Sequence, residues 1–356
     1  MDLCANGGGA CVIRDDHLVM CWGDSAVLAD GPTPAARATH SPCFTGDCSS
    51  SPIVVRRVDG SYLYADEIEC ANSGACARTS IGEVYCWGSV PVAVPGGGSV
   101  AHRAVQVTGA GLGSNASSLW STALGTCASI PGNTGGGSQF GELDGASTGS
   151  IGVTSAGIEV GGTGAYSLCT VGGATVQCRG GPYEIGPSAT GPSATLVSLP
   201  AFTSPVSVLG GGAQAMCALV ADEVWCWGIT NCGSLGYGTA SNGAHPTPGR
   251  VGAGYARLWT SAFSPRVCAR TSAGDVECWG QLACPVDGAS AAPVRVPELA
   301  GARQIAPGLN AVCAIQATGG VVCAGRNESK QLGREPETFT VDPVFATVCI
   351  TDDCIF

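Results

Sequence analysis

A cysteine cassette recurs along this chain and constrains its fold more than any other feature. In the full form, a cysteine is followed nine or ten residues later by Cys-Trp-Gly. Four copies keep this form: Cys11 to Cys21, Cys76 to Cys86, Cys217 to Cys226 and Cys268 to Cys278. Two copies lack the tryptophan, Cys169 to Cys178 and Cys313 to Cys323, and a seventh keeps only Cys127. The first cysteines lie roughly 40 to 65 residues apart, a period typical of solenoids, propellers and repeat arrays.

Each cassette predicts a hairpin that is closed by its own disulfide. In the copy from Cys268 to Cys278, Gly274-Asp275 supplies a tight turn between two short strands. Opposed residues in such a pair have α-carbons about 4.5 Å apart, which suits a disulfide. The expected pairs are Cys11–Cys21, Cys76–Cys86, Cys169–Cys178, Cys217–Cys226, Cys268–Cys278 and Cys313–Cys323. The cassette tryptophans are expected to be structural: Trp22, Trp87, Trp227 and Trp279.

The composition shows why such crosslinks matter. Glycine makes up 55 of 356 residues, aromatic residues 6% and charged residues 12%, so the chain buries little apolar surface per residue. With 45% hydrophobic residues it is nevertheless too apolar to be disordered. Closing a loop of about ten residues contributes on the order of 2.5 to 3 kcal/mol in the chain-entropy model. We therefore expect the disulfides to offset a weak core.

Twenty-one cysteines in this arrangement indicate an oxidising compartment, so we expect a secreted or cell-surface protein. Zinc sites favour Cys-x(2 to 4)-Cys pairs, and the four histidines are scattered without register, so neither a metal nor a cofactor is predicted. The chain opens without a signal peptide, which indicates a mature form or an excised domain. It has no apolar run of the length that crosses a membrane.

The residues around each cassette predict the other strands of the unit. About eight residues before the first cysteine lies an apolar position that we interpret as an inner strand: Leu3, Ile68, Trp120, Leu209, Trp259 and Ile305. A Pro/Val-rich stretch lies about a dozen residues further upstream in several units, at 52–55, 104–107 and 293–296. Four strands per unit, repeated seven times, predict an all-β fold: a seven-bladed propeller of four-stranded antiparallel blades.

The ends of the chain predict how the ring closes. The first unit begins at its inner strand and lacks an upstream Pro/Val strand, so we expect Asp342–Val348 to complete the first blade and lock the ring. The prediction is one domain, 1–356. Its cassettes lie at about 3–24, 68–89, 119–160, 161–181, 208–237, 258–285 and 304–334.

The pattern resembles the regulator of chromosome condensation repeat, which reads approximately Cys-Ala-Leu, a turn, Val-x-Cys-Trp-Gly-x-Asn, then Gly-Gln-Leu-Gly. One unit matches it as Cys217-Ala-Leu219, Val224–Gly228, Asn231 and Gly233-Ser-Leu-Gly236. Another matches it as Cys313-Ala-Ile315, Val322–Gly325, Asn327 and Lys330-Gln-Leu-Gly333. The paired cysteines resemble the exported bacterial branch of this family rather than the nuclear exchange factor.

The resemblance implies a binding protein. Members of the family present loops on one propeller face to a protein partner, as in nucleotide exchange on a small GTPase or inhibition of a secreted β-lactamase, and the repeat carries no catalytic residues. The oxidising compartment disfavours nucleotide exchange here. The net charge is −11 and the sequence has no basic stripe, which disfavours binding to nucleic acid because the chain would repel phosphate.

No enzyme motif stands against this interpretation. The histidines His17, His40, His102 and His245 occupy unrelated repeat positions, and no Gly-x-Ser-x-Gly elbow, His-Glu-x-x-His helix or phosphate loop occurs. A propeller can still gather residues from distant blades, so an exported hydrolase or lyase stays an open alternative.

The other cysteines predict a second layer of crosslinks. Cys4 and Cys70 lie at nearly equivalent places in neighbouring units, as do Cys232 and Cys284. Two similar hexapeptides, Cys43–Cys48 and Cys349–Cys354, suit small local loops. Connectivity does not follow from sequence, and a bond from Cys354 to Cys4 is an alternative. Cys127 is left over as a buried thiol or an intermolecular link.

Two functions of different class remain. In the first, the chain is a recognition module that binds a protein or a surface glycan through loops on one face. The insertion from Asp24 to Ser51 is our first choice for a functional loop, because it is too long for a simple turn. In the second, the chain is a structural subunit of a surface assembly that packs against copies of itself. No membrane insertion is predicted.

Overall fold

A computed structural model of the chain defines the positions of most of its strands. It describes residues 1–25, 27–29, 31, 41–43, 46–71, 74–88, 101–107, 116–122, 125–129, 138–141, 160–163, 167–181, 183–187, 193–212, 214–230, 233–238, 243–262, 264–280, 291–335 and 342–350. The prediction for the third cassette, 119–160, falls largely outside these residues. No helix among the described residues is long and apolar enough to cross a membrane.

The first three sheets follow one another along the chain. The first contains β1 (Asp2–Ala5), β2 (Gly9–Ile13), β3 (Val19–Asp24), β5 (Gly46–Val54) and β4 (Ser41–Cys43), in that spatial order. The second contains β6 (Glu67–Ala71), β7 (Gly74–Arg78), β8 (Val84–Gly88) and β9 (Ala101–Gln106). The third contains β10 (Ser118–Thr122), β11 (Gly125–Ser129) and β12 (Ser138–Gly141).

The remaining sheets have four strands each. They comprise β13 (Val160–Thr163), β14 (Ser167–Gly172), β15 (Thr175–Gly180) and β16 (Ser193–Ser198); β17 (Val206–Gly212), β18 (Ala215–Val220), β19 (Glu223–Thr230) and β20 (Gly243–Ala253); β21 (Tyr255–Trp259), β22 (Val267–Thr271), β23 (Val276–Trp279) and β24 (Val294–Arg295); and β25 (Gln304–Pro307), β26 (Ala311–Ile315), β27 (Val321–Gly325) and β28 (Asp342–Val348). A 3₁₀ turn, η1 (Pro297–Leu299), precedes β25.

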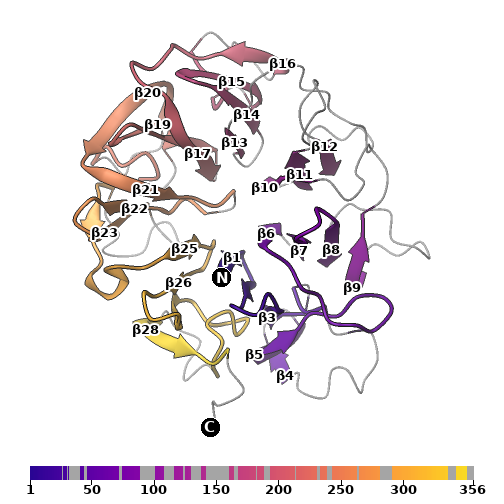
Figure 1. The fold of residues 1–356 in the computed structure, drawn as a ribbon. Helices are drawn as coiled ribbons and strands as arrows, with labels where there is room; N and C mark the ends of the chain where they lie inside the picture. The colour runs from indigo at the N-terminus through magenta and orange to yellow at the C-terminus, as the bar shows by residue number, and fades with distance from the viewer. Residues whose placement is uncertain are drawn as a thin grey trace.

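The sheets are arranged around a common centre (Figure 1). The first strand of each sheet faces the middle and the later strands lie progressively further out, so the sheets radiate like spokes. The fold is therefore all-β and built from antiparallel sheets, as the repeat predicts. Its inner strands lie at or next to the predicted apolar positions, for example Leu3 in β1 and Ile68 in β6.

The predicted order of strands within a unit was wrong. The Pro/Val stretches at 52–55 and 104–107 pair with the preceding cassette strands, β5 with β3 and β9 with β8, and do not start the following unit. The chain reverses after each Cys-x-Gly and runs back antiparallel along the strand it has just left. This connection within one sheet is shorter than a crossing to the next.

The predicted strand at the C-terminus was misplaced for the same reason. Asp342–Val348 forms β28, which pairs with β27 in the last sheet, while the first sheet takes its fourth strand, β5, from its own downstream segment. No strand from the C-terminus completes the first sheet within the described residues. The first and last sheets meet through side chains instead of through a shared strand.

Each described cassette forms the expected hairpin. The two cysteines lie directly opposite each other in β2–β3, β7–β8, β14–β15, β18–β19, β22–β23 and β26–β27. All six pairs are disulfide-bonded, with α-carbons 4.0 to 4.1 Å apart. The staples thus link adjacent strands of the same sheet.

The residue between the second cysteine and the glycine sits in a β-bulge. Pairing with the fourth strand shifts register between Cys21 and Gly23, and the same shift recurs in four further sheets. The glycine of the motif adopts a positive φ, 102° at Gly23, and a Cβ there would collide with the carbonyl oxygen of Gly8. A bulge of this kind re-aims the side chain it carries.

The bulge carries the cassette tryptophans Trp22, Trp87 and Trp227, and Trp279 holds the same motif position in β23, where no register shift is described. Each tryptophan reaches the preceding sheet. Its indole N–H donates to a backbone carbonyl there: Trp22 to Gln331 (3.0 Å), Trp87 to Val27 (2.9 Å), Trp227 to Glu184 (2.8 Å) and Trp279 to Ser234 (3.1 Å). All four indoles are fully buried. We call each of these an indole–carbonyl contact.

The acceptors occupy equivalent places in the repeat. Each is followed by a buried apolar residue, and three of these pairs are followed by a glycine with positive φ, as in Ser234-Leu235-Gly236. A Cβ on Gly236 would come within 2.9 Å of the Trp279 indole nitrogen. The Gln-Leu-Gly part of the repeat therefore provides the acceptor and the space for the next sheet's tryptophan.

Replacing Trp279 with phenylalanine should lower the free energy of unfolding by about 1–3 kcal/mol. The change keeps an aromatic ring but leaves the buried carbonyl of Ser234 without its donor. Urea unfolding curves measure the effect. The control is Trp225→Phe, because Trp225 is half-buried and its indole donates to the Glu223 carboxylate of the same strand. An equal loss in both variants would contradict the assignment.

The buried carboxyl of Glu184 should make the free energy of unfolding fall as the pH rises. Burial raises the pKa of this carboxyl to about 7, against a hydrogen bond from Ser167 that lowers it. The folded chain then holds a proton that the unfolded chain releases near pH 4.5, so stability declines between about pH 4.5 and 7, by roughly 3 kcal/mol. Glu184→Gln should flatten this decline in unfolding curves measured across that range. An unchanged slope would contradict it.

Candidate functional site

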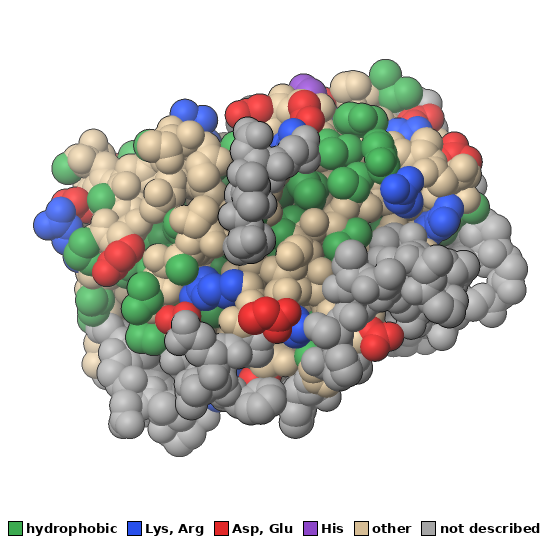
Figure 2. All heavy atoms as spheres, turned by 90° about the horizontal axis from the view of Figure 1, so that it is seen from below, with side chains coloured by type: hydrophobic (Ala, Val, Ile, Leu, Met, Phe, Trp, Pro, Cys, Tyr) green, Lys and Arg blue, Asp and Glu red, His purple; other side chains and the backbone are tan. Residues whose placement is uncertain are grey.

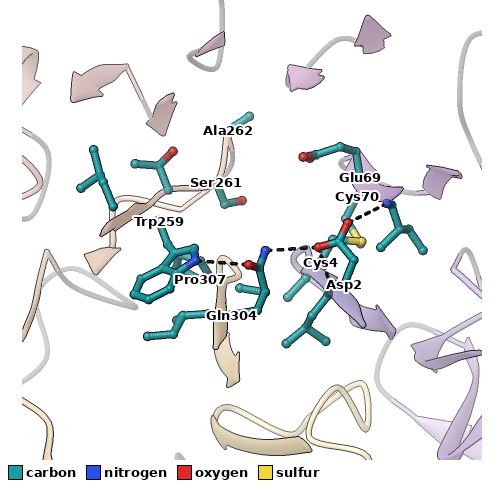
Figure 3. Close-up of a pocket in the computed structure, with 16 residues that line it drawn as sticks. Asp2, Cys4, Glu69, Cys70, Trp259, Ser261, Ala262, Gln304 and Pro307 are labelled. Atoms are coloured by element: carbon teal, nitrogen blue, oxygen red, sulfur yellow. Dashed lines mark hydrogen bonds between the residues drawn. A yellow bond between two sulfur atoms is a disulfide. The ribbon is translucent and has the colours of Figure 1, made fainter. Parts of the chain in front are cut away.

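A cavity of about 200 Å³ lies among the inner strands β1, β6, β21 and β25 (Figure 3). Asp2 and Glu69 line one side of it, Trp259 and Ser261 the other, and Gln304 the wall between them. The disulfide between Cys4 and Cys70 joins β1 to β6 beside the two acids. The cavity therefore brings together residues from distant parts of the chain, such as Gln304 and Asp2, which are 302 positions apart and hydrogen-bonded.

Neutral donors hold the Asp2 carboxylate. The backbone N–H of Ile68 donates to Oδ2 at 2.9 Å, and that of Leu3 to Oδ1 at 2.9 Å. The Gln304 amide donates to Oδ1 at 3.2 Å, while its own oxygen accepts from the Trp259 indole at 3.4 Å. This chain of hydrogen bonds ties Asp2 of β1 to β6 and β25 directly, and to β21 through Gln304.

Both cavity acids hold protons more tightly than exposed carboxyls. Burial raises the pKa of Asp2 to about 6, and the backbone hydrogen bonds only partly oppose it. Burial also raises the pKa of Glu69 well above its usual value, and the charges of Asp2 and Glu67 add to the effect. Among the described residues, no group of three or more His, Cys, Asp or Glu is placed to hold a metal ion.

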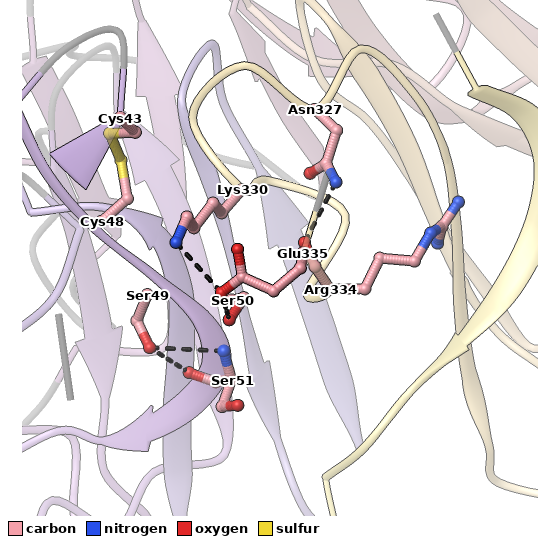
Figure 4. Close-up of polar contacts among 9 residues, drawn as sticks. All are labelled: Cys43, Cys48, Ser49, Ser50, Ser51, Asn327, Lys330, Arg334 and Glu335. Carbon is pink, nitrogen blue, oxygen red and sulfur yellow. Dashed lines mark hydrogen bonds and ion pairs between the residues drawn. A yellow bond between two sulfur atoms is a disulfide. The ribbon is translucent and has the colours of Figure 1, made fainter. Parts of the chain in front are cut away.

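A hairpin at the outer edge of the first sheet is the second candidate site (Figure 4). Its strands β4 and β5 are joined by the Cys43–Cys48 disulfide, with α-carbons 5.9 Å apart. β4 is a fifth strand, beyond the four-stranded plan of the other complete sheets. This hairpin belongs to the Asp24–Ser51 insertion, our first choice for a functional loop.

The hairpin is anchored to the last sheet. The Ser50 hydroxyl donates to Glu335 Oε1 at 2.7 Å, and the ammonium of Lys330 lies 3.1 Å from the same oxygen. Lys330 is buried although it carries a charge. The bond from Ser50, assisted by Lys330, holds the pKa of Glu335 below its usual value. The hairpin is therefore held on both sides, by its own sheet and by the last one.

One face of the molecule and one segment of it show how the exposed side chains are distributed. Figure 2 shows the molecule from below, where acidic and basic side chains are scattered and hydrophobic ones gather in one area. The segment between β5 and β6 exposes Val58, Tyr62 and Tyr64. The Arg56 guanidinium stacks on Tyr62, 4.6 Å from the ring centre. Arginine and tyrosine are enriched at protein interfaces.

The structure brings together several of the remaining cysteines. Cys4 forms a disulfide with Cys70, with α-carbons 5.4 Å apart. This bond excludes the alternative disulfide between Cys354 and Cys4. Cys349 is disulfide-bonded, but its expected partner Cys354 lies outside the described residues, as do Cys232 and Cys284. Cys127 lies in β11 opposite Trp120 and Gln139. Its role as a free thiol stays a prediction.

Two features were not predicted from the sequence: the carbonyl acceptors of the tryptophans and the acidic pair of the cavity. The carbonyl acceptors for the tryptophans have no side-chain signature, although the Leu-Gly that follows them is part of the repeat. Asp2 and Glu69 flank apolar positions of inner strands, and nothing local shows that their neighbours across the centre are Trp259 and Gln304. The useful signal was acidic residues on strands that are expected to face the middle of a ring.

No protein-family model matches the chain. A curated human relative, the regulator of chromosome condensation, is 29% identical over 153 residues, which are 40% of this chain and 36% of that protein. The match thus spans about a third of the relative's length.

Solved structures share the fold along nearly the whole chain. Human WBSCR16 has a TM-score of 0.71 at 14% identity and covers 94% of each chain. Yeast RCC1 (Prp20), solved with Kap60 bound, has a TM-score of 0.72 at 14% identity and covers 96% of this chain and 86% of its own. The ectodomain of the receptor kinase CR4 from Physcomitrella patens has a TM-score of 0.56 at 16% identity. The match covers 91% of this chain and 73% of the ectodomain chain. The resemblance to the RCC-type propellers is confirmed in fold.

Removing the two kinds of disulfide should have different effects. Cys11→Ser with Cys21→Ser opens a staple between buried strands and should lower the free energy of unfolding by about 2–3 kcal/mol. Cys43→Ser with Cys48→Ser opens an edge hairpin and should leave the urea midpoint nearly unchanged while speeding proteolysis within residues 41–51. Equal shifts of both midpoints would show that the hairpin is part of the cooperative core.

Proposed function

We propose that this RCC-like β-propeller is a non-enzymatic recognition module of the cell exterior, which binds a protein partner through inter-strand loops on one face. The observation that carries the proposal is the β4–β5 hairpin. It extends the first sheet beyond the common plan, is closed by its own disulfide and is anchored through Ser50 to Glu335. A rigid scaffold that holds a projecting element is the usual arrangement of a binding loop.

The proposal includes a closed ring of seven blades within one domain. Its support is the indole–carbonyl contact from Trp22 to Gln331, which joins the first and last sheets by the same bond that joins neighbouring sheets elsewhere. Apolar residues of both sheets, such as Leu3, Ile315 and Leu332, also share one cluster. A closed ring leaves no open face at either end of the array.

Two observations support an exterior location. The disulfides at the centres of the hairpins persist in an oxidising compartment and are rare in reducing ones. The similar fold of the plant receptor kinase is an ectodomain. A secreted or cell-surface protein fits both, and the bacterial source stays a prediction.

Protein binding is favoured over the other functions. The similar yeast propeller was solved with the protein Kap60 bound. Of the histidines, His17 pairs with an exposed Asp66 at 2.7 Å and His245 packs on the ring of Tyr237; neither lines the central cavity. A surface glycan as the partner, a structural subunit that self-assembles and an exported hydrolase or lyase are alternatives. No cofactor is predicted.

Shortening the insertion tests the proposal. Residues 32–46 are replaced by a short Gly/Ser connector together with Cys48→Ser, which keeps the acceptor Val27 and strand residues 47–54 in place. The purified chain is immobilised and incubated with extracellular fluid of its source. We expect at least one protein to be retained saturably by the parent and lost, by tenfold or more, from the variant.

The matched control changes a different hairpin tip. Ser272 and Ala273, which lie in the exposed turn between β22 and β23, are replaced by glycine and should retain the partner. Equal retention by all three proteins would overturn the assignment to the insertion. Light scattering then addresses self-assembly: one species near 35.3 kDa supports the recognition module, whereas growth with concentration supports the structural subunit.

A further inference from the structure

Two arginines face each other across paired strands where the sheet of β21–β24 meets the last sheet. Arg257 of β21 and Arg270 of β22 are register partners, so their side chains leave the same side of the sheet. The Cβ atoms of such partners are about 5 Å apart, and like charges at these positions destabilise a sheet. Both strands lie beside β25 (Figure 1).

The other repeats of the chain show that this like-charged pair is unusual. The equivalent register pair lies two residues beyond the first cassette cysteine and its partner, and in the second sheet it is Glu67 and Arg78, an ion pair at 2.7 Å. In the other five sheets the pair holds at most one charge: Asp2–Ile13, Ser118–Ser129, Val160–Val171, Val208–Leu219 and Gln304–Ile315. The sheet of β21–β24 alone places two positive charges there.

A third arginine joins the pair at the start of the last sheet. Nη1 of Arg257 donates to the carbonyl oxygen of Arg303 at 2.9 Å, and Nη1 of Arg270 to that of Ala302 at 3.0 Å. Because these carbonyls belong to consecutive residues, the two guanidiniums lie close together and next to the origin of the Arg303 side chain. Arg257 and Arg303 are exposed and Arg270 is half-buried. Three positive charges therefore gather at one accessible place, which we call the arginine triad.

No acid in the described part of the chain forms an ion pair with the arginine triad. The acids of the neighbouring strands have other partners: Asp275 pairs with Arg295 at 2.5 Å, and Glu277 accepts from the Tyr255 hydroxyl at 2.6 Å. Glu298 of η1 is exposed and forms no ion pair with a described residue. Because the chain carries 27 acidic residues against 16 basic ones, this cluster of unneutralised positive charge contrasts with its surroundings and attracts anions.

One small anion with two charges suits the triad better than two separate carboxylates. Two guanidiniums whose side chains start about 5 Å apart repel each other, and an anion between them attracts both at once. A phosphate group carries a charge of about −1.5 to −2 near pH 7 and has three strong acceptor oxygens. Each guanidinium has five N–H donors, and its fork geometry matches phosphate oxygens through paired hydrogen bonds.

We propose that the arginine triad binds a phosphate group, either as free phosphate or as a monoester on a partner molecule. Arg257 and Arg270 hold the group between them, and their bonds to the carbonyls of Arg303 and Ala302 keep both guanidiniums in place. Arg303 supplies the third positive charge. Binding relieves the repulsion within the register pair, so phosphate should also stabilise the folded chain.

Titration calorimetry in excess chloride tests the site with two phosphate probes. Inorganic phosphate represents the free ion, and Nα-acetyl-O-phosphoserine methylamide represents a monoester. Nα-acetyl-serine methylamide is the uncharged control, and Nα-acetyl-Asp-Asp methylamide represents paired carboxylates. We expect saturable one-to-one binding of a phosphate probe and none of the uncharged control, and the tighter phosphate probe identifies the source. Equally tight binding of the aspartate pair, or no binding of either phosphate probe, would overturn the proposal.

Three variants locate the binding. Arg257→Glu creates the Glu–Arg register pair of the second sheet, so it should weaken phosphate binding about tenfold or more while thermal unfolding occurs at an equal or higher temperature. Arg303→Gln changes an exposed side chain without a hydrogen bond or ion pair among the described residues, and it should weaken binding about threefold without a change in stability. Arg250→Gln removes an exposed arginine that is paired with Glu223 in another sheet, and it should leave binding unchanged.

Undiminished phosphate binding by Arg257→Glu or by Arg303→Gln would show that the triad is not the site. The variant with the shortened insertion keeps all three arginines and should bind phosphate as the parent does. This proposal and the proposed function therefore fail independently.

Discussion

The indole–carbonyl contact between neighbouring sheets is the interaction on which the rest of the structure depends. Disulfides fasten strands within a sheet, and with the exception of Cys4–Cys70 none of those described crosses between sheets. The clusters between sheets consist largely of aliphatic side chains such as Leu3, Ile315 and Leu332, whose packing has no preferred direction. A buried tryptophan with one directed hydrogen bond supplies both area and orientation there.

Disulfides act within sheets and tryptophans between them, and this explains the three residues of the Cys-Trp-Gly motif. The cysteine staples the hairpin, the bulge turns the next side chain toward the neighbouring sheet, and the glycine permits the positive φ that the bulge requires. Where the tryptophan is replaced, by Arg179 and Ala324, the staple and the bulge remain. The two functions of the motif are therefore separable along the chain.

Much of this architecture was predictable, because the repeat encodes local geometry. Opposed cysteines define hairpins, and apolar positions at fixed distances define inner strands. The order of strands was not predictable from spacing, since a stretch such as 52–55 lies between two cassettes in sequence and could pair with either; only the reversal after Gly23 decides between them. The cavity depends on Asp2, Glu69 and Gln304 meeting across the centre, and their sequence separations carry no signal of that proximity.

The short span of the hairpin disulfides has a consequence for biogenesis. Their cysteines are 9 or 10 residues apart, so each bond can form as soon as its own hairpin reaches an oxidising compartment, before the rest of the chain arrives. Correct pairing then needs no search among distant thiols, which limits the role of disulfide isomerases. Cys4 must instead wait for Cys70, 66 residues later, and stays reactive during that interval.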